Sequence, residues 1–447
     1  MLKRKIDNQL IEWKKRADRK PLIVKGARQV GKTASIRHFA QQHYKHVVEI
    51  NFVLQRQYQG IFADGYEVDT ILRNITLLNP EFEIEAGDTL FFFDELQACP
   101  DCATCLKSFK IDGRFDVICS GSLMGVHYQQ IESNSVGYKE DILMHSMDFE
   151  EFLWACGYDE NLTEDLFAHM IEVRPLSTLM MTRLTELFRQ YMVLGGMPEV
   201  VNTFVTQHHY AGTLSLQRQL LLDYEEDITK YAVGFEKAKV LAVYRHISTF
   251  LAQENKRFQV TKITQNARNR QYMGAVEWLE NAGIVNVCYC LHELTLPLKG
   301  NYDPKRYKVY YSDTGLLIAS LDEEAQEDLR QNQNFSTYKG AIYENIVADM
   351  LVKQGYDLYY YRNDKLNIEM DFFVRSANHL WPIEVKASNT ASVSLNRLTE
   401  GAGRKHATDI QYGIKLCAAN IGFNGKFYTF PYFLTFLLKR WLRNFSH

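Results

Sequence analysis

The sequence lacks the features that mark secreted, membrane-spanning and strongly basic proteins. Its 447 residues carry 51 Lys and Arg against 54 Asp and Glu, so no global electrostatic attraction toward nucleic acid exists. It has no apolar run of about 18 residues, the length that a membrane-spanning helix needs. The first five residues are followed by an amphipathic segment and not by an apolar core, so we expect no secretory signal, no membrane partner and a cytoplasmic location.

Cysteine is also scarce, since eight cysteines in 447 residues do not suggest a disulfide framework. Three of them form the pattern C-x-x-C-x-x-C at Cys99, Cys102 and Cys105. This spacing could bind a metal or a cluster. No fourth ligand is evident nearby, however, and successive turns of one helix produce the same spacing. We therefore favour an inert helical surface at these cysteines.

The sequence does contain short apolar strands that alternate with helices. Strands are predicted at 22–24, 47–52, 89–93 and 116–120, and a helix is predicted at 35–44. This alternation indicates a parallel α/β sheet. The length predicts two to four domains.

The first predicted strand runs directly into a complete G-x-x-x-x-G-K-[ST] phosphate-binding loop. The loop consists of Gly26, Ala27, Arg28, Gln29, Val30, Gly31, Lys32 and Thr33. Its backbone N–H groups and the start of the following helix would surround a phosphate. Lys32 would neutralise the β- and γ-phosphates, and Thr33 would place a hydroxyl on Mg²⁺. The alternative is a chance glycine-rich turn.

An apolar strand that ends in two acids supplies the expected partner of this loop. Asp94 and Glu95 follow Phe91–Phe93. We expect Asp94 to hold Mg²⁺ and Glu95 to polarise the attacking water. Ser120, at the end of the next strand, could sense the γ-phosphate.

A second constellation lies near the C-terminal end, where Asp371 precedes the E-x-K pattern of Glu384 and Lys386. Strand alternation puts Glu384 and Lys386 on one face. With Asp371 on the neighbouring strand, these groups would bind one or two Mg²⁺ or Mn²⁺ ions and stabilise phosphodiester cleavage. The alternative is a solvated strand face, because alternating charge on a strand is common.

The segment between these two sites is helical and is interrupted by Gly195-Gly196-Met197-Pro198. Three helices followed by two strands over 239–312 predict a winged helix. Lys256, Arg257, Lys262, Arg268 and Arg270 lie before or at the start of its third helix, 269–282, and could contact DNA phosphates, but the same segment could be a packing module. Two other stretches are locally basic, residues 3–20 and the tail from 404 to 443.

The loop, the Asp94-Glu95 pair, Ser120-Gly121-Ser122 and Phe149-Glu150-Glu151-Phe152 together resemble a prokaryotic AAA-like ATPase family related to the STAND ATPases. That family carries a C-terminal domain of restriction-endonuclease-like fold. The resemblance implies that Glu344, on the helix that precedes Asp371, is an additional acid of its metal site. The resemblance covers the whole chain. It implies an α/β fold with four domains: an ATPase domain (1–158), a helical lid (159–235), a winged helix (236–325) and a restriction-endonuclease-like domain (326–447).

The resemblance also implies that Gly196 and Pro198 belong to a lid element that contacts the nucleotide, although a simple helix-breaking turn explains them equally well. At 137–139 this chain has Gly-Tyr-Lys where the family often has Gly-Arg. The role of an arginine acting across a subunit border is therefore in doubt, because Lys139 cannot supply a bidentate fork. AAA-like sites commonly lie at such borders, so we expect ATP-dependent homo-oligomers.

Three functional hypotheses follow, of which the third is a plain interaction scaffold with slow turnover. In the first, ATP with Mg²⁺ drives a protein that acts on DNA and controls a C-terminal metal-dependent nuclease. In the second, the protein is a nucleotide-operated switch, and its C-terminal domain is an inactive binding module. The dependence of ATP turnover on added DNA separates the first from the second.

Overall fold

A computed structural model of the chain describes residues 1–122, 135–232, 235–251, 258, 271–321, 324–331, 333, 338–387, 391–399 and 409–445. The chain divides into two compact units, which we describe separately. The first comprises Met1–Ser146 with Asn281–Gly283, and the second comprises Met147–Glu280 with Ile284–His447. Within the described ranges, every helix is too short or too polar to cross a membrane.

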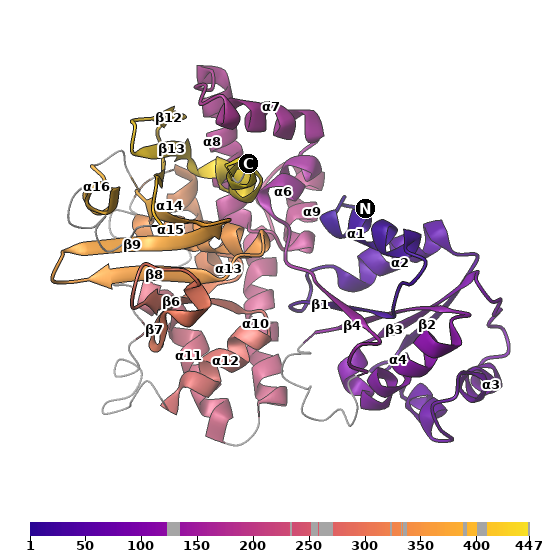
Figure 1. The fold of residues 1–447 in the computed structure, drawn as a ribbon. Coiled ribbons are helices and arrows are strands. Elements are labelled where there is room, and N and C mark those ends of the chain that lie inside the picture. Colours follow the sequence, from indigo (N-terminus) through magenta and orange to yellow (C-terminus); the bar gives the residue numbers. More distant parts are fainter. Residues whose placement is uncertain are drawn as a thin grey trace. The chain divides into compact units, whose positions relative to one another are not determined.

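The first unit is built on a five-stranded sheet of order β2-β3-β4-β1-β5, in which all neighbouring strands are parallel. Figure 1 shows α2 and α4 on opposite faces of this sheet. In chain order its elements are α1 (Lys5–Lys15), β1 (Leu22–Lys25), α2 (Lys32–His43), β2 (His46–Asn51), α3 (Val68–Leu78), β3 (Thr89–Asp94), α4 (Pro100–Asp112), β4 (Asp116–Gly121) and β5 (Glu140–Leu143). The four predicted strands are confirmed. The edge strand β5 was not predicted, because its sequence Glu-Asp-Ile-Leu is half charged.

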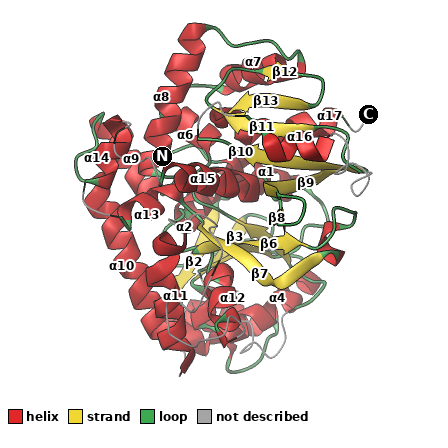
Figure 2. Ribbon diagram, turned by 90° about the vertical axis from the view of Figure 1, so that its left-hand side faces the viewer, coloured by secondary structure: helices red, strands yellow, loops and turns green. Residues whose placement is uncertain are grey.

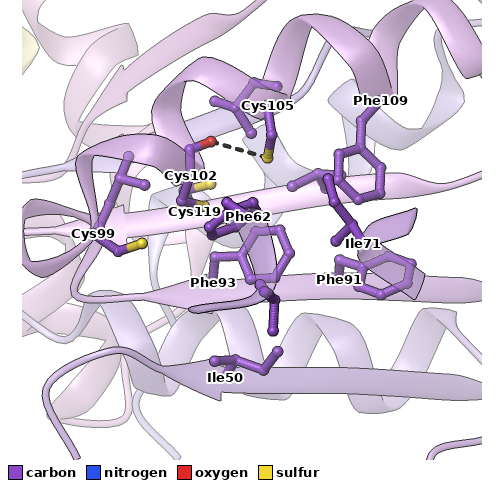
Figure 3. Close-up of a cluster of buried hydrophobic side chains, with 14 of the residues drawn as sticks. Ile50, Phe62, Ile71, Phe91, Phe93, Cys99, Cys102, Cys105, Phe109 and Cys119 are labelled. Carbon is purple, nitrogen blue, oxygen red and sulfur yellow. Dashed lines mark hydrogen bonds between the residues drawn. The ribbon is translucent and has the colours of Figure 1, made fainter. Parts of the chain in front are cut away.

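The cysteines of the C-x-x-C-x-x-C pattern lie in the core of the first unit, not on a helical surface as we expected (Figure 3). Cys102 and Cys105 are fully buried on α4, where they pack with Phe91, Phe93 and neighbouring apolar side chains. Burial raises the pKa of the Cys99 thiol to about 12. The thiolate form that metals require is therefore disfavoured.

The second unit begins with a helical segment. It contains α6 (Phe149–Ala155), α7 (Glu160–Ile171), α8 (Thr178–Leu194), α9 (Pro198–Gln207), α10 (Thr213–Tyr231), α11 (Phe235–Leu251) and α12 (Met273–Asn281). Asp148 caps α6, because its carboxylate accepts a hydrogen bond from the Glu151 backbone N–H and the Glu151 side chain reciprocates. The predicted break is confirmed: α8 ends at Leu194, and Pro198 is the first residue of α9.

The rest of the second unit is an eight-stranded mixed sheet of order β12-β13-β11-β10-β9-β8-β6-β7. Its strands are β6 (Val285–Leu291), β7 (Tyr302–Tyr311), β8 (Leu358–Asn363), β9 (Ile368–Ser376), β10 (His379–Val385), β11 (Gly413–Cys417), β12 (Gly422–Phe423) and β13 (Phe427–Pro431). The accompanying helices are α13 (Thr314–Ala319), α14 (Ala325–Gln331), α15 (Lys339–Lys353), α16 (Val393–Thr399) and α17 (Leu438–Asn444). Figure 2 shows α16 lying over β9 and β10, which it contacts.

This sheet continues across the predicted boundary between the winged helix and the C-terminal domain. β6 pairs with β7 in antiparallel fashion and with β8 in parallel fashion, so the two strands of the predicted winged helix extend the C-terminal sheet. The five cations predicted to lie near the third winged-helix helix, 256–270, fall outside the described residues. The winged helix itself and the four domain boundaries stay predictions.

Candidate functional site

The phosphate-binding loop connects the end of β1 to the start of α2, and its backbone requires glycine at two positions. A Cβ atom on Gly26 would lie 2.1 Å from the Met144 carbonyl oxygen. Gly31, directly before α2, has φ +97°, a conformation that other residues rarely adopt. These two glycines shape the loop so that its N–H groups and the start of α2 can meet a phosphate.

Lys32 is buried in this loop, with only 7% of its surface exposed. Its ammonium donates hydrogen bonds to the carbonyl oxygens of Gly26 (3.0 Å) and Ala27 (2.7 Å). Burial lowers the pKa of Lys32 to about 8, although the charges of Glu95 and Asp94 partly oppose the shift. The ammonium thus makes its hydrogen bonds to neutral carbonyl groups, and a triphosphate would neutralise it far better.

Asp94, at the end of β3, is the centre of a polar group at the carboxyl edge of the sheet. Its carboxylate accepts a hydrogen bond from the Ser120 hydroxyl, and the Thr33 hydroxyl lies 3.3 Å from each of its oxygens. Sequence reasoning predicted these three residues, and the structure brings them together. It missed Asn51, whose side-chain N–H donates to Asp94 Oδ2 at 3.0 Å. The signal for Asn51 was available, because it ends a neighbouring parallel strand and pairs in register with Asp94.

Glu95 follows Asp94 in a left-handed backbone conformation, with φ +58°. This turn directs the chain away from β3 into a short 3₁₀ helix, Leu96–Ala98. The Glu95 carboxylate accepts a hydrogen bond from the Gln97 amide, which also lies 3.5 Å from the Ser122 hydroxyl. A non-glycine residue at positive φ is strained, and such strain is concentrated at functional sites.

Arg4 is a second residue of this site that the sequence did not reveal. It is 5% exposed, and its guanidinium donates 2.8 Å hydrogen bonds to the carbonyl oxygens of Val30 and His145. Arg4 therefore ties the phosphate-binding loop to the start of α1 and to the chain after β5. Arg4 belongs to the locally basic stretch of residues 3–20, and the basic composition of that stretch does not mark it as buried.

Several other cations of the two basic stretches also make internal contacts. In the first stretch, Arg19 pairs with Asp116 at 2.7 Å, and Arg16 pairs with Glu140 at 2.6 Å. In the tail, Arg440 pairs with Glu164 at 2.5 Å. Arg404 and Lys405 lie outside the described residues. These pairs reduce the positive charge that the two stretches can offer to nucleic acid.

In the second unit, β9 and β10 bring Asp371, Glu384 and Lys386 together. The antiparallel register pairs Ile383 with Phe372, so Glu384 comes opposite Asp371, and opposite residues share a face. Asp371 Oδ2 accepts a hydrogen bond from the Val385 backbone N–H at 2.8 Å. Lys386 Nζ lies 2.8 Å from Glu384 Oε1. Burial lowers the pKa of Lys386, but the bond to Glu384 and the charges of Asp371 and Glu369 outweigh it and raise the pKa.

Glu344, the fourth predicted residue, has a different partner. It is buried on α15, and its Oε1 atom lies 2.9 Å from Lys308 Nζ on β7. The Tyr310 hydroxyl donates to the same oxygen. Burial lowers the pKa of Lys308, but the charges of Glu344, Asp371 and Glu369 raise it well above its ordinary value. We did not predict Lys308, because it lies in the segment that we assigned to the winged helix.

The donor set of this cluster partly fits a divalent cation. Glu384 is 2% exposed, and its Oε2 atom is buried without a hydrogen-bond partner, as expected for an oxygen that awaits a cation. Within the described residues, however, no group of three His, Cys, Asp or Glu side chains is placed to hold a metal ion. Asp371 and Glu384 lie opposite each other on paired strands, whereas Glu344 already faces an ammonium.

Gly196 has a clear packing role in the second unit. Its backbone N–H donates to Asp313 Oδ2 at 2.7 Å, and its carbonyl accepts from the Met147 N–H at 2.7 Å. A Cβ atom on Gly196 would lie 1.9 Å from the Met147 carbonyl oxygen. These contacts explain the glycine without a ligand, and the nucleotide contact of Gly196 and Pro198 stays a prediction.

Three family models match successive segments of the chain. The family model of the AAA domain matches residues 18–153. Two families described only as domains of unknown function, DUF8612 and DUF4143, match residues 185–327 and 339–433. No curated protein matches the chain.

Solved structures resemble the chain only distantly. A Walker-type ATPase of Pyrococcus abyssi has a TM-score of 0.44 and 13% identity, covering 72% of this chain and 96% of that one. The ORC1 protein of Aeropyrum pernix in complex with DNA has a TM-score of 0.27 and 11% identity, covering 73% and 90%. Cdc6p from Pyrobaculum aerophilum has a TM-score of 0.27 and 11% identity, covering 73% and 92%. At these TM-scores the resemblances support no conclusion about function.

The fold, the loop and the AAA match define the class of the first unit. A parallel sheet carries a complete phosphate-binding loop after β1 and an acid pair after β3, within the residues that the AAA domain model matches. The N-terminal part of this chain is an AAA-like ATPase domain of the P-loop type. The parts that follow match only families of unknown function.

Proposed function

We propose that the protein hydrolyses ATP at the Asp94 centre and uses the cycle to control the action of its C-terminal acidic cluster on DNA. The observation that carries the first half is the convergence of Thr33, Ser120 and Asn51 on the Asp94 carboxylate. Such a carboxylate, next to a phosphate-binding loop, is suited to hold Mg²⁺ beside the β- and γ-phosphates.

In this mechanism each residue has a distinct task. Lys32 leaves the carbonyls of Gly26 and Ala27 and pairs with the β- and γ-phosphates. Glu95 accepts a proton from the water that attacks the γ-phosphorus, and Ser120 contacts the γ-phosphate. Mg²⁺ held through Thr33 and Asp94 would neutralise charge on the phosphate oxygens. The Gln97 side chain donates to one oxygen of Glu95 and would help to orient this carboxylate toward water.

The proposal for the C-terminal cluster rests on the adjacency of Asp371, Glu384 and Lys386. Two carboxylates on paired strands with a lysine beside them suit a divalent cation and a phosphodiester. A metal ion there would polarise the scissile phosphate, while Lys386 would hold or orient the attacking water.

The test uses purified protein with linear, circular or single-stranded DNA, with Mg²⁺ or Mn²⁺, and with or without ATP. We expect DNA to stimulate ATP turnover and the DNA to be cut. Asp371→Ala and Lys386→Ala should each abolish cutting and leave the basal ATP turnover unchanged. If these two variants still cut DNA like the unaltered protein, the cutting does not come from this cluster.

A second function is favoured by the internal pairing of the acids. Glu344 is bound by Lys308 and Tyr310, and Glu384 is bound by Lys386, so the cluster is largely neutralised from within. In this alternative the C-terminal domain binds a partner without chemistry, and ATP operates the protein as a switch. If added DNA does not change ATP turnover, and the DNA stays uncut with either metal ion, the result would favour the switch.

A further inference from the structure

The acidic cluster of the second unit, formed by Glu344, Glu369, Asp371 and Glu384, contains a buried cation of its own. Lys308 Nζ lies 2.9 Å from Glu344 Oε1 and 3.8 Å from Glu369 Oε1, and the side chains of Lys308 and Glu344 are each 2% exposed. Burying an ammonium is costly unless close opposite charges compensate it. The negative charges of Glu344 and Glu369 therefore offset the cost of burying the Lys308 ammonium.

The two sides of the cluster differ in whether their carboxylate oxygens already have hydrogen-bond or ionic partners. On the α15 side, Glu344 Oε1 already has two partners, the Lys308 ammonium and the Tyr310 hydroxyl. On the β10 side, Lys386 pairs with Glu384 Oε1, but Glu384 Oε2 is buried without a hydrogen-bond partner. A buried carboxylate oxygen without a donor is a costly arrangement that a cation would relieve.

We infer that Lys308 permanently takes the place of a metal ion at Glu344 and thereby limits the cluster to at most one divalent cation, at Glu384 beside Asp371. The inference rests on the metal-binding role proposed above for this cluster. An ammonium and a divalent cation repel each other and compete for one carboxylate oxygen, and Lys308 already holds Glu344 Oε1. At Glu384, by contrast, Lys386 holds Oε1, and the oxygen without a hydrogen-bond partner is Oε2. Lys308 thus decides how many metal ions the cluster accepts.

The test counts bound Mn²⁺ in nucleotide-free protein by equilibrium dialysis and detects paired ions by their spin coupling in electron paramagnetic resonance. Glu384→Gln shows which bound ions belong to the cluster. Lys308→Met removes the ammonium but keeps the chain length. The matched control is Lys353→Met, because Lys353 is also a buried lysine on a carboxylate, 2.8 Å from Asp349. Lys353 lies nine residues after Glu344 on α15, or about 13.5 Å along the helix at about 1.5 Å per residue.

We expect the unaltered protein to bind one Mn²⁺ that Glu384→Gln loses. Lys308→Met should gain a second Mn²⁺, spin-coupled to the first, and the gain should vanish when Glu344→Gln is added. Lys353→Met should match the unaltered protein. Two coupled ions in the unaltered protein, or no gain in Lys308→Met, would overturn the inference.

Two further outcomes keep the inference separate from the proposed function. If the unaltered protein binds no Mn²⁺ but Lys308→Met does, Lys308 replaces a metal as inferred, and the metal-dependent nuclease proposal fails. If Lys308→Met does not fold by itself, refolding in the presence of Mn²⁺ should restore its fold. Mn²⁺ should not restore the fold of Lys353→Met. Equal rescue, or rescue of neither variant, counts against the inference.

Discussion

At the scale of single residues, burial changes the chemistry of the ATPase site most at Lys32. The ammonium is enclosed by the loop and donates hydrogen bonds to two carbonyl oxygens, and burial weakens its hold on its proton. A bound triphosphate would reverse that effect by placing full negative charge beside the ammonium.

We therefore expect ATP affinity to decrease above pH 8. The pKa of Lys32 is about 8 without nucleotide, and bound ATP should raise it, so binding above this pH takes up a proton. The dissociation constant should increase by up to about tenfold per pH unit above 8. Isothermal titration calorimetry in buffers of different ionisation enthalpy measures both the affinity and the proton uptake.

Lys32→Arg provides the control, because a guanidinium keeps its charge throughout this range. Its affinity should be lower but nearly independent of pH. An unaltered protein whose affinity is equally flat would show that Lys32 is charged before ATP binds.

Glu95→Gln should retain ATP binding but slow its hydrolysis by about 10²–10⁴-fold, the usual effect of losing a general base. The amide keeps the size of the side chain but cannot accept a proton from water. Steady-state phosphate release and a separate nucleotide-binding measurement distinguish the two effects. Normal hydrolysis in this variant would assign the base to another group.

At the scale of elements, the start of α1 is coupled to the phosphate-binding loop through Arg4. We expect Arg4→Met to weaken ATP binding about tenfold, or ~1.4 kcal/mol, which is comparable with one hydrogen bond from a charged group. The reason is that the Val30 carbonyl and the loop lose their anchor. Fluorescence titration with a labelled ATP analogue measures the change.

The matched control is Arg19→Met, which removes the ion pair to Asp116 at the opposite end of the parallel strands. It should affect stability without a comparable loss of affinity. Similar losses in both variants would mean that Arg4 acts only through general stability.

The turn between α8 and α9 depends on glycine for packing. Gly196→Ala should destabilise the protein by about 1–3 kcal/mol, because the new methyl group meets the Met147 backbone. Urea unfolding measures the effect. Gly422→Ala is the control, since nothing lies within 4 Å of its added Cβ atom, and it should be nearly neutral. A neutral Gly196→Ala would show that the turn relaxes freely.

At the scale of the whole molecule, we expect an ATP analogue to promote self-association. The expectation rests on the common location of AAA-like nucleotide sites at subunit borders. It does not rest on any single residue of this chain. Lys139, at the position where an arginine was expected, lies 2.7 Å from Asp141 Oδ1 within its own unit. Analytical sedimentation with and without the analogue provides the test, and an unchanged monomer would contradict the expectation. Lys32→Ala, which should not bind the analogue, is the control.

By itself, the sequence predicted four of the five strands of the first unit and the residues of the phosphate-binding loop and the acid pair. Apolar runs fitted buried strands, and the loop and acid pair need particular residue types at fixed spacing. Asp94, Thr33 and Ser120 could be grouped in advance because the carboxyl ends of parallel strands meet at one edge. Asp371 and Glu384 could be grouped by strand alternation and pairing.

Only the tertiary structure decided which buried charges meet. Arg4 and Lys308 act on groups 26 and 36 residues away, and no local pattern marks either contact. The cysteine pattern was equally ambiguous, because the same helical spacing suits a surface or a core until the packing partners of α4 are known. The physical reason is that burial and long-range pairing depend on how distant segments of the chain pack together. Periodicity and motifs depend only on residues that are close in the sequence, so they do not predict such contacts.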